Sequence, residues 1–75
     1  MGKGTQKLSN RLRELRQARG GITQQELADR VGITRQTIIA IEGNRYSPSL
    51  EVAFMIADAL KVRIDEVFHC DTNAS

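Results

Sequence analysis

The chain contains little of what enzymes and metal proteins use for chemistry. It has one histidine and one cysteine, adjacent at positions 69 and 70, and it has no tryptophan. A single cysteine excludes an internal disulfide framework, and one His–Cys pair supplies too few ligands for a structural zinc site. His69 and Cys70 also lie in a segment without helical periodicity, where a nucleophile and its base would be poorly fixed. We therefore expect neither an enzyme nor a bound metal or cofactor.

Long apolar runs are also missing. No run approaches the roughly 18 residues of a membrane-spanning helix, and no signal-peptide core is present near the start. We therefore expect no membrane contact and a reducing, cytoplasmic location. With 75 residues, 40% of them hydrophobic, the chain is expected to form one small globular domain. The expected boundaries are a mobile arm over residues 1–6, the domain over 7–68 and a flexible tail over 69–75.

The net charge of +2 is small, but it is unevenly distributed. Residues 1–46 hold nine Lys/Arg and four Asp/Glu, whereas residues 47–75 hold two Lys/Arg and five Asp/Glu. A basic first half and an acidic second half fit a protein that turns one surface toward phosphates. An ordinary solvated surface is the alternative interpretation of this charge pattern alone.

The middle of the chain predicts two short helices joined by a tight turn. Thr23 and Glu26 have the spacing of a capping box, and Leu27 and Val31 fall on one face of the helix that follows. Gly32 is expected to end that helix, because glycine takes the left-handed backbone without steric cost.

A second helix begins directly after this turn. Thr34 is a good N-cap, Ile38 and Ile41 share one face, and Gly43-Asn44 supplies a stop. A helix, a glycine turn and a second helix form the helix-turn-helix pattern of proteins that read the major groove of DNA.

Three further helices are predicted around this pair. The first spans about residues 7–19, the fourth ends at about Leu60, and a short fifth contains Ile64, Val67 and Phe68. The cap of the fourth helix is either Ser47 or Ser49. No segment has the period of a strand, so the predicted fold is all-α, with five short helices around one core. The apolar stripe expected on the fourth helix is Leu50, Ala53, Phe54, Ala57 and Leu60.

The chain resembles the phage repressor and Cro-type helix-turn-helix regulators, also called Xre-like, in their compact stand-alone form. The resemblance covers about residues 8–68 and is carried by RLRELRQARG, TQQELADRVGITRQTI, AIE, Arg45-Tyr46-x-Pro48-Ser49-Leu50, EVAFMIADAL and IDEVF. It implies a lambda-repressor-like domain that acts as a homodimeric transcriptional repressor or autoregulator. The operator would be near-palindromic, with half-sites about 34 Å apart.

Base reading is expected from the outward side of the third helix. Arg35 can hold the O6 and N7 atoms of guanine, and Gln36 can hold the N6 and N7 atoms of adenine. Ile39 suits either a thymine methyl group or a partner protein. The alternative for Arg35 and Gln36 is an ordinary solvated surface. The expected base-reading set is Arg35, Gln36, Ile39 and Ala40.

The DNA backbone is expected to contact residues around this helix. Gln24 begins the second helix, where free N–H groups and the helix dipole favour an anion. In the family that the chain resembles, the matching glutamine clamps the DNA backbone. The full set of expected phosphate contacts is Gln24, Thr34, Thr37, Arg45, Tyr46 and Arg11, although the Tyr46 ring can instead pack over the fourth helix.

The resemblance also implies an ion pair between Arg16 and Glu42, joining the first helix to the end of the third. If this pair is buried, it orients the recognition helix more than it stabilises the fold. The expected dimer seam lies around the fourth and fifth helices, with core burial as the alternative for its last three residues. Its members are Leu60, Val62, Ile64, Val67 and Phe68.

A protein-interaction module, such as an antitoxin, is the competing function. Val52, Met55 and Ile39 are apolar at positions that the helical stripes do not clearly bury, and methionine adapts well to partner surfaces. Both functions are compatible, because a protein with this fold can bind DNA and a partner protein.

Overall fold

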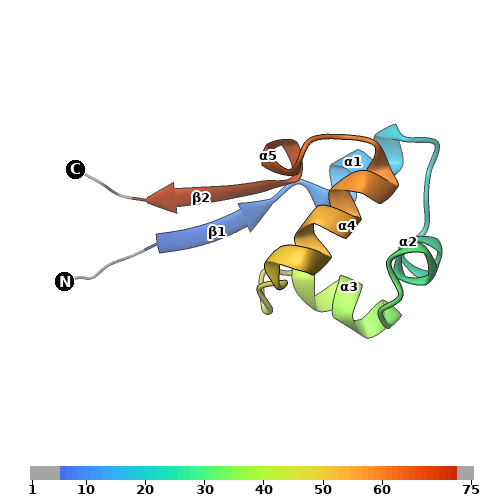
Figure 1. The fold of residues 1–75 in the computed structure, drawn as a ribbon, viewed down its shortest axis with the longest axis horizontal. Coiled ribbons are helices and arrows are strands. Elements are labelled where there is room, and N and C mark those ends of the chain that lie inside the picture. The colour runs from blue at the N-terminus through green and yellow to red at the C-terminus, as the bar shows by residue number, and fades with distance from the viewer. Residues whose placement is uncertain (1–5, 73–75) are drawn as a thin grey trace.

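In a computed structural model, which describes residues 6–72, five helices form a body from which a two-stranded antiparallel ribbon extends (Figure 1). No helix in this range is both long enough and apolar enough to cross a membrane. The elements in chain order are β1 (Gln6–Asn10), α1 (Leu12–Ala18), α2 (Gln24–Val31), α3 (Arg35–Glu42), α4 (Leu50–Leu60), α5 (Ile64–Val67) and β2 (Phe68–Thr72).

One apolar core lies between the helices, and every helix contributes to it. Half-buried Leu15, Ile22 and Phe68 pack against its margin. The five predicted helices and the single core are thereby confirmed. The buried members of the core are Leu12, Leu27, Ala28, Val31, Ile38, Ile41, Ile56, Ala57, Leu60 and Val67.

The helix-turn-helix is set by short-range contacts, as its sequence predicts. The Thr23 hydroxyl accepts the Glu26 N–H at 3.0 Å, and the Glu26 carboxylate accepts the Thr23 N–H at 2.9 Å. Gly32 takes the left-handed conformation at φ 84° and ends α2. The Thr34 hydroxyl then accepts the Thr37 N–H at 3.1 Å and caps α3. The caps and the glycine turn are therefore confirmed.

The connector from α3 to α4 has its own stop and start signals. Asn44, and not Gly43, takes the left-handed backbone, with φ 60° for Asn44 and −85° for Gly43. Of the two serines considered for the α4 cap, the structure selects Ser49, whose hydroxyl accepts the Val52 N–H at 3.2 Å.

Both ends of the described chain differ from the predicted helix and tail. The first helix does not begin near Lys7, because residues 6–10 form β1 and pair with residues 68–72. The tail expected from His69 is therefore wrong as far as Thr72. The Arg11 N–H continues the ladder by donating to the Val67 carbonyl at 2.8 Å, and α1 begins only after it. The expected mobile arm over residues 1–6 lies, apart from Gln6, outside the described residues.

The apolar stripe predicted on α4 also needs correction. Ala53, Ile56, Ala57 and Leu60 face the core, whereas Leu50 and Phe54 do not. Leu50 is 70% exposed and Phe54 is 53% exposed. At 100° per residue, Phe54 lies more than a quarter turn from the centre of the buried stripe, which includes Ile56 in its place. These two side chains therefore belong to the surface of the molecule.

Candidate nucleic-acid interface

The outward side of α3 is available along its length. Ile38 and Ile41 are buried and fix the inward direction, as predicted. Arg35 and Gln36 are exposed, Ala40 is half-buried, and Ile39 is 39% exposed despite its apolar side chain. Every residue assigned to base reading therefore lies on a surface that a ligand can approach.

A buried ion pair holds the far end of this helix. Arg16 Nε donates to Glu42 Oε2 at 2.6 Å and Nη2 donates to Oε1 at 3.2 Å, a two-point contact between α1 and the last residue of α3. The third donor of the guanidinium, Nη1, bonds the Ile22 carbonyl at 2.8 Å. The side chains of Arg16 and Glu42 are only 11% and 10% exposed. The geometry of the implied pair is thus present, and its hydrogen bonds fix the position of α3 against α1.

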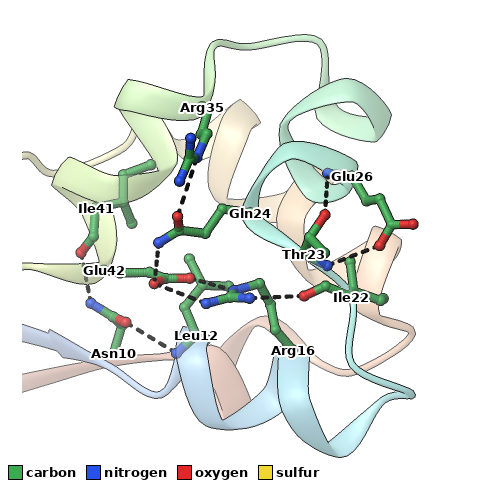
Figure 2. Close-up of polar contacts among 10 residues, drawn as sticks. All are labelled: Asn10, Leu12, Arg16, Ile22, Thr23, Gln24, Glu26, Arg35, Ile41 and Glu42. Carbon is green, nitrogen blue, oxygen red and sulfur yellow. Dashed lines mark hydrogen bonds and ion pairs between the residues drawn. The ribbon is translucent and has the colours of Figure 1, made fainter.

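Figure 2 shows that the contacts of this pair continue toward the first residue of α3. The Gln24 amide donates from Nε2 to Glu42 Oε1 at 3.1 Å and accepts from Arg35 Nε at 3.4 Å. The contact with Arg35 is long and therefore weak. One side chain therefore joins the start of α2 and both ends of α3.

The N-terminus of α2 presents donors beside this network. Within the described part of the chain, the backbone N–H groups of Gln24 and Gln25 have no protein acceptor, whereas the Glu26 N–H is occupied by Thr23. These free donors and the helix dipole favour an anion. The carboxylate of Glu26 is exposed, and the backbone N–H of Thr23 holds its pKa below the ordinary value of 4.5.

The residues predicted to hold phosphates fall into groups with different surroundings. The side chains of Thr34, Thr37 and Tyr46 share a shallow depression with Gln36 and Ala40, so Tyr46 lies beside the outward side of α3. Tyr46 is 53% exposed.

The two arginines predicted to hold phosphates are both exposed. Arg45 follows α3, and its backbone N–H bonds the Ala40 carbonyl at 2.9 Å. Arg11 already pairs with Glu14 at 3.0 Å, an exposed contact of the kind that contributes little free energy. Arg11 is therefore free to exchange that partner for a phosphate.

The residues predicted to form a dimer seam are mostly inside the monomer. Leu60 is 1% exposed and Val67 is fully buried, so neither can meet a partner. Val62, Ile64 and Phe68 are half-buried and pack against the same core. Core burial, which was the alternative interpretation, therefore accounts for most of this set, since α5 is too short to present a separate apolar face.

Asn10 is a structural residue that the sequence analysis missed. Its amide donates to the Ile41 carbonyl at 2.9 Å and to Asn44 Oδ1 at 3.0 Å, both at the end of α3. Its Oδ1 accepts the N–H of Leu12, the first residue of α1, at 3.0 Å. The side chain therefore joins the ribbon, α1 and the end of α3 (Figure 2). The available signal in the sequence was an asparagine two residues before the helix. The sequence analysis instead placed Asn10 inside a longer first helix, over about residues 7–19.

Comparison with known proteins agrees with this geometry. The family model described as helix-turn-helix matches residues 12–67, which include all five helices. The chain belongs to this helix-turn-helix family. Membership places it among the DNA-binding transcriptional regulators and not among enzymes.

Similar proteins occur in archaea and in a bacterium. An uncharacterized HTH-type transcriptional regulator of Methanothermobacter thermautotrophicus is 55% identical over 56 residues, covering 73% of this chain and 81% of that protein. One from Archaeoglobus fulgidus is 44% identical over 64 residues, covering 85% and 90%. The regulator YgzD of Bacillus subtilis is 44% identical over 61 residues, covering 81% and 91%. The helix-turn-helix chain thus spans most of the length of each relative.

Proposed function

We propose that this chain is a homodimeric, sequence-specific transcriptional repressor or autoregulator that inserts α3 into the major groove of a near-palindromic operator. The observation that carries the proposal is the network from Arg16 through Glu42 and Gln24 to Arg35. It fixes the last residue of α3 to the body and reaches the first through Gln24, while the outward side of the helix stays exposed. A rigid helix of this kind presents its side chains to base edges in one orientation.

In this proposal, side chains on α3 read bases and the surrounding groups hold phosphates. Arg35 and Gln36 form hydrogen bonds with base edges, while Ile39 and Ala40 contact thymine methyl groups. The free N–H groups at the start of α2 and the Gln24 side chain hold one phosphate. The other phosphate contacts come from Thr34, Thr37, Arg45, Tyr46 and Arg11.

The decisive experiment is selection of bound duplexes from a random DNA pool at physiological salt. Enrichment of an inverted repeat with half-sites one helical turn apart is the expected result. Weak, salt-sensitive binding without an enriched sequence would contradict the proposal. A reporter placed behind the selected operator then separates repression from activation.

Variants distinguish base reading from phosphate binding on the selected operator. Arg35→Ala should relax the preference at one base position by about 1–3 kcal/mol, because a two-point contact with guanine is lost. Gln24→Ala should weaken binding to all sequences alike. Arg63→Ala is the matched control, since it removes an exposed arginine directly before α5. Helix α5 lies on the other side of the body from α3 (Figure 1).

The apolar surface of α4 favours one second candidate, a protein-interaction module such as an antitoxin. Leu50, Phe54 and Met55 are 70%, 53% and 40% exposed, whereas Val52 packs partly against the core. Phe54 and Met55 also border a shallow groove together with Arg30 and Asp58. An apolar protein contact responds little to salt, whereas DNA affinity falls steeply with it. The two activities therefore separate in a salt titration with each ligand.

A further inference from the structure

The ribbon of β1 and β2 projects away from the helical body (Figure 1). The molecule is 39 Å long but only 21 and 19 Å across, and its radius of gyration is 12.7 Å. A compact chain of this length has a radius of gyration of about 11 Å, so the ribbon is not folded back onto the core. Two-stranded ribbons are only marginally stable alone in water, and their unpaired edges accept further strands.

The register shows which backbone groups form these edges. Gln6 pairs with Thr72 and Asn10 with Phe68, and the Arg11 N–H bonds the Val67 carbonyl in the same ladder. Antiparallel pairs alternate between those that exchange hydrogen bonds and those that do not. Because Arg11 and Val67 form a hydrogen-bonded pair, so do Ser9 and His69, whose backbone N–H and C=O groups point toward each other between the strands. The backbone N–H and C=O groups of Leu8 and Cys70 point to the outer edges instead.

We infer that the outer edge of β2 is the seam of the homodimer, an inference that rests on the dimer of the proposed function. Two copies pair their β2 strands antiparallel about a two-fold axis at Cys70, giving a four-stranded sheet. Each Cys70 then exchanges both backbone hydrogen bonds with its copy. The occupant of the edge is a second copy of this chain, because the helical residues considered for a seam are largely taken up by the core.

The sequence of β2 suits pairing with itself. A two-fold axis at Cys70 places position 69 of one copy opposite position 71 of the other, so a histidine meets an aspartate twice. An imidazole N–H can donate a hydrogen bond to a facing carboxylate, whereas like charges at facing positions destabilise a sheet. His69 and Cys70 are both exposed, so the edge is open to a second strand. On β1, by contrast, the residue at the corresponding centre, Leu8, is half-buried.

The seam is linked to the DNA-reading surface through Asn10. This residue ends β1 and bonds the Ile41 carbonyl at 2.9 Å, next to the last residue of α3. The Arg11–Val67 hydrogen bond fixes β2 to the start of α1 in the same region. A sheet formed by two ribbons therefore sets the separation and tilt of the two recognition helices. Asn10 acts here as a positioning residue and does not contact the DNA.

Proline substitutions test the edge directly, because proline removes one backbone N–H. In Cys70→Pro the lost donors are those of the seam, so the dimer dissociation constant should rise by roughly tenfold or more. Leu8→Pro is the matched control, since it removes the donor at the outer edge of β1 and should leave a dimer.

Cys70→Ser should also remain a dimer, which excludes a disulfide as the link. Sedimentation equilibrium under reducing conditions measures all four proteins, and circular dichroism checks their folding.

A charge variant keeps the test decisive if a proline variant fails to fold. His69→Asp faces Ser9 within the chain but Asp71 of the second copy, so it should weaken the dimer several-fold. Adding Asp71→Asn should restore much of the loss. A Cys70→Pro protein that stays dimeric, equal dissociation of Cys70→Pro and Leu8→Pro, or no response to His69→Asp would overturn the β2 seam.

The outcome is separable from that of the proposed function. A wild-type protein of 8.4 kDa in solution and on DNA would refute the seam, yet an enriched DNA sequence would still support a DNA reader. A dimer that dissociates on Cys70→Pro but enriches no DNA sequence would support the seam and refute the operator-binding function.

Discussion

The helix-turn-helix of α2 and α3 and the ribbon of β1 and β2 are held together by contacts of different range. In the helix-turn-helix, Thr23 with Glu26 and Thr34 with Thr37 each join residues three positions apart. In the ribbon, Gln6 lies opposite Thr72, so strands from the two ends of the described chain must meet. Closing so long a loop has a large entropy cost before any strand contact forms. We therefore expect the ribbon to form only once the helical body has brought Arg11 and Val67 together.

The largest expected effect comes from breaking the body through its buried ion pair. Glu42→Ala leaves the Arg16 guanidinium buried without its carboxylate partner. Removing one member of a buried pair costs about 3–5 kcal/mol, a large part of the stability of a small domain. The ribbon should be lost in the same transition, since its strands are aligned by the body. Urea unfolding followed by circular dichroism, with amide signals of β1 and β2 followed by NMR, measures both regions.

Glu14→Ala is the control for this prediction. It also removes one carboxylate from an arginine, but the Arg11–Glu14 pair is exposed, with side chains 56% and 71% accessible. Exposed pairs contribute about 0–1 kcal/mol, so the unfolding midpoint should hardly move. Equal losses in the two variants would show that burial of the Arg16–Glu42 pair does not matter.

The same difference in range explains what the sequence could predict. Caps, the Gly32 turn and the inward isoleucines of α3 are signals within a few residues, and each predicted one is present. The implied Arg16–Glu42 pair came from resemblance, since no local rule joins residues 26 positions apart. The interactions of DNA with Arg35, Gln36 and Gln24 remain predictions, because they concern a second molecule.

The ribbon gave no comparable signal. QKLSN holds a single apolar residue, and the apolar–polar alternation in FHCDT extends over only four residues, too short to mark a strand clearly. Leu8 continued the spacing of Leu12 and Leu15, which favoured a longer first helix than the one that forms. The pairing becomes visible only when α5 and α1 bring Val67 and Arg11 together. The exposed Phe54 was misplaced for a related reason, because both sides of α4 are apolar and only its neighbours select the buried one.

An intermediate effect is expected from cutting the link between body and ribbon. Asn10→Ala removes the acceptor of the Leu12 N–H and both bonds to the end of α3, and should cost about 1–2 kcal/mol. Asn10→Asp keeps the acceptor for the Leu12 N–H but loses the donor to Ile41 and Asn44. If Asn10 positions the ribbon, Asn10→Asp should lower affinity for the full operator more than for a half-site. Equal losses on both DNA fragments would show that Asn10 stabilises the fold without positioning the ribbon.

The smallest expected effect concerns the body alone, through the capping box that starts α2. The Glu26 carboxylate accepts the Thr23 backbone N–H, and chiefly this bond lowers its pKa in the folded protein below 4.5. Because the folded pKa lies below the unfolded one, ionised Glu26 favours the folded state above the unfolded pKa. That contribution disappears as the pH falls through the folded pKa.

Wild-type stability should therefore decline more steeply than that of Glu26→Gln between about pH 5 and pH 3. Urea titrations at a series of pH values measure this slope, and parallel curves for the two proteins would contradict the assignment. Operator affinity at neutral pH should change little in Glu26→Gln, since the free donors of Gln24 and Gln25 remain in place.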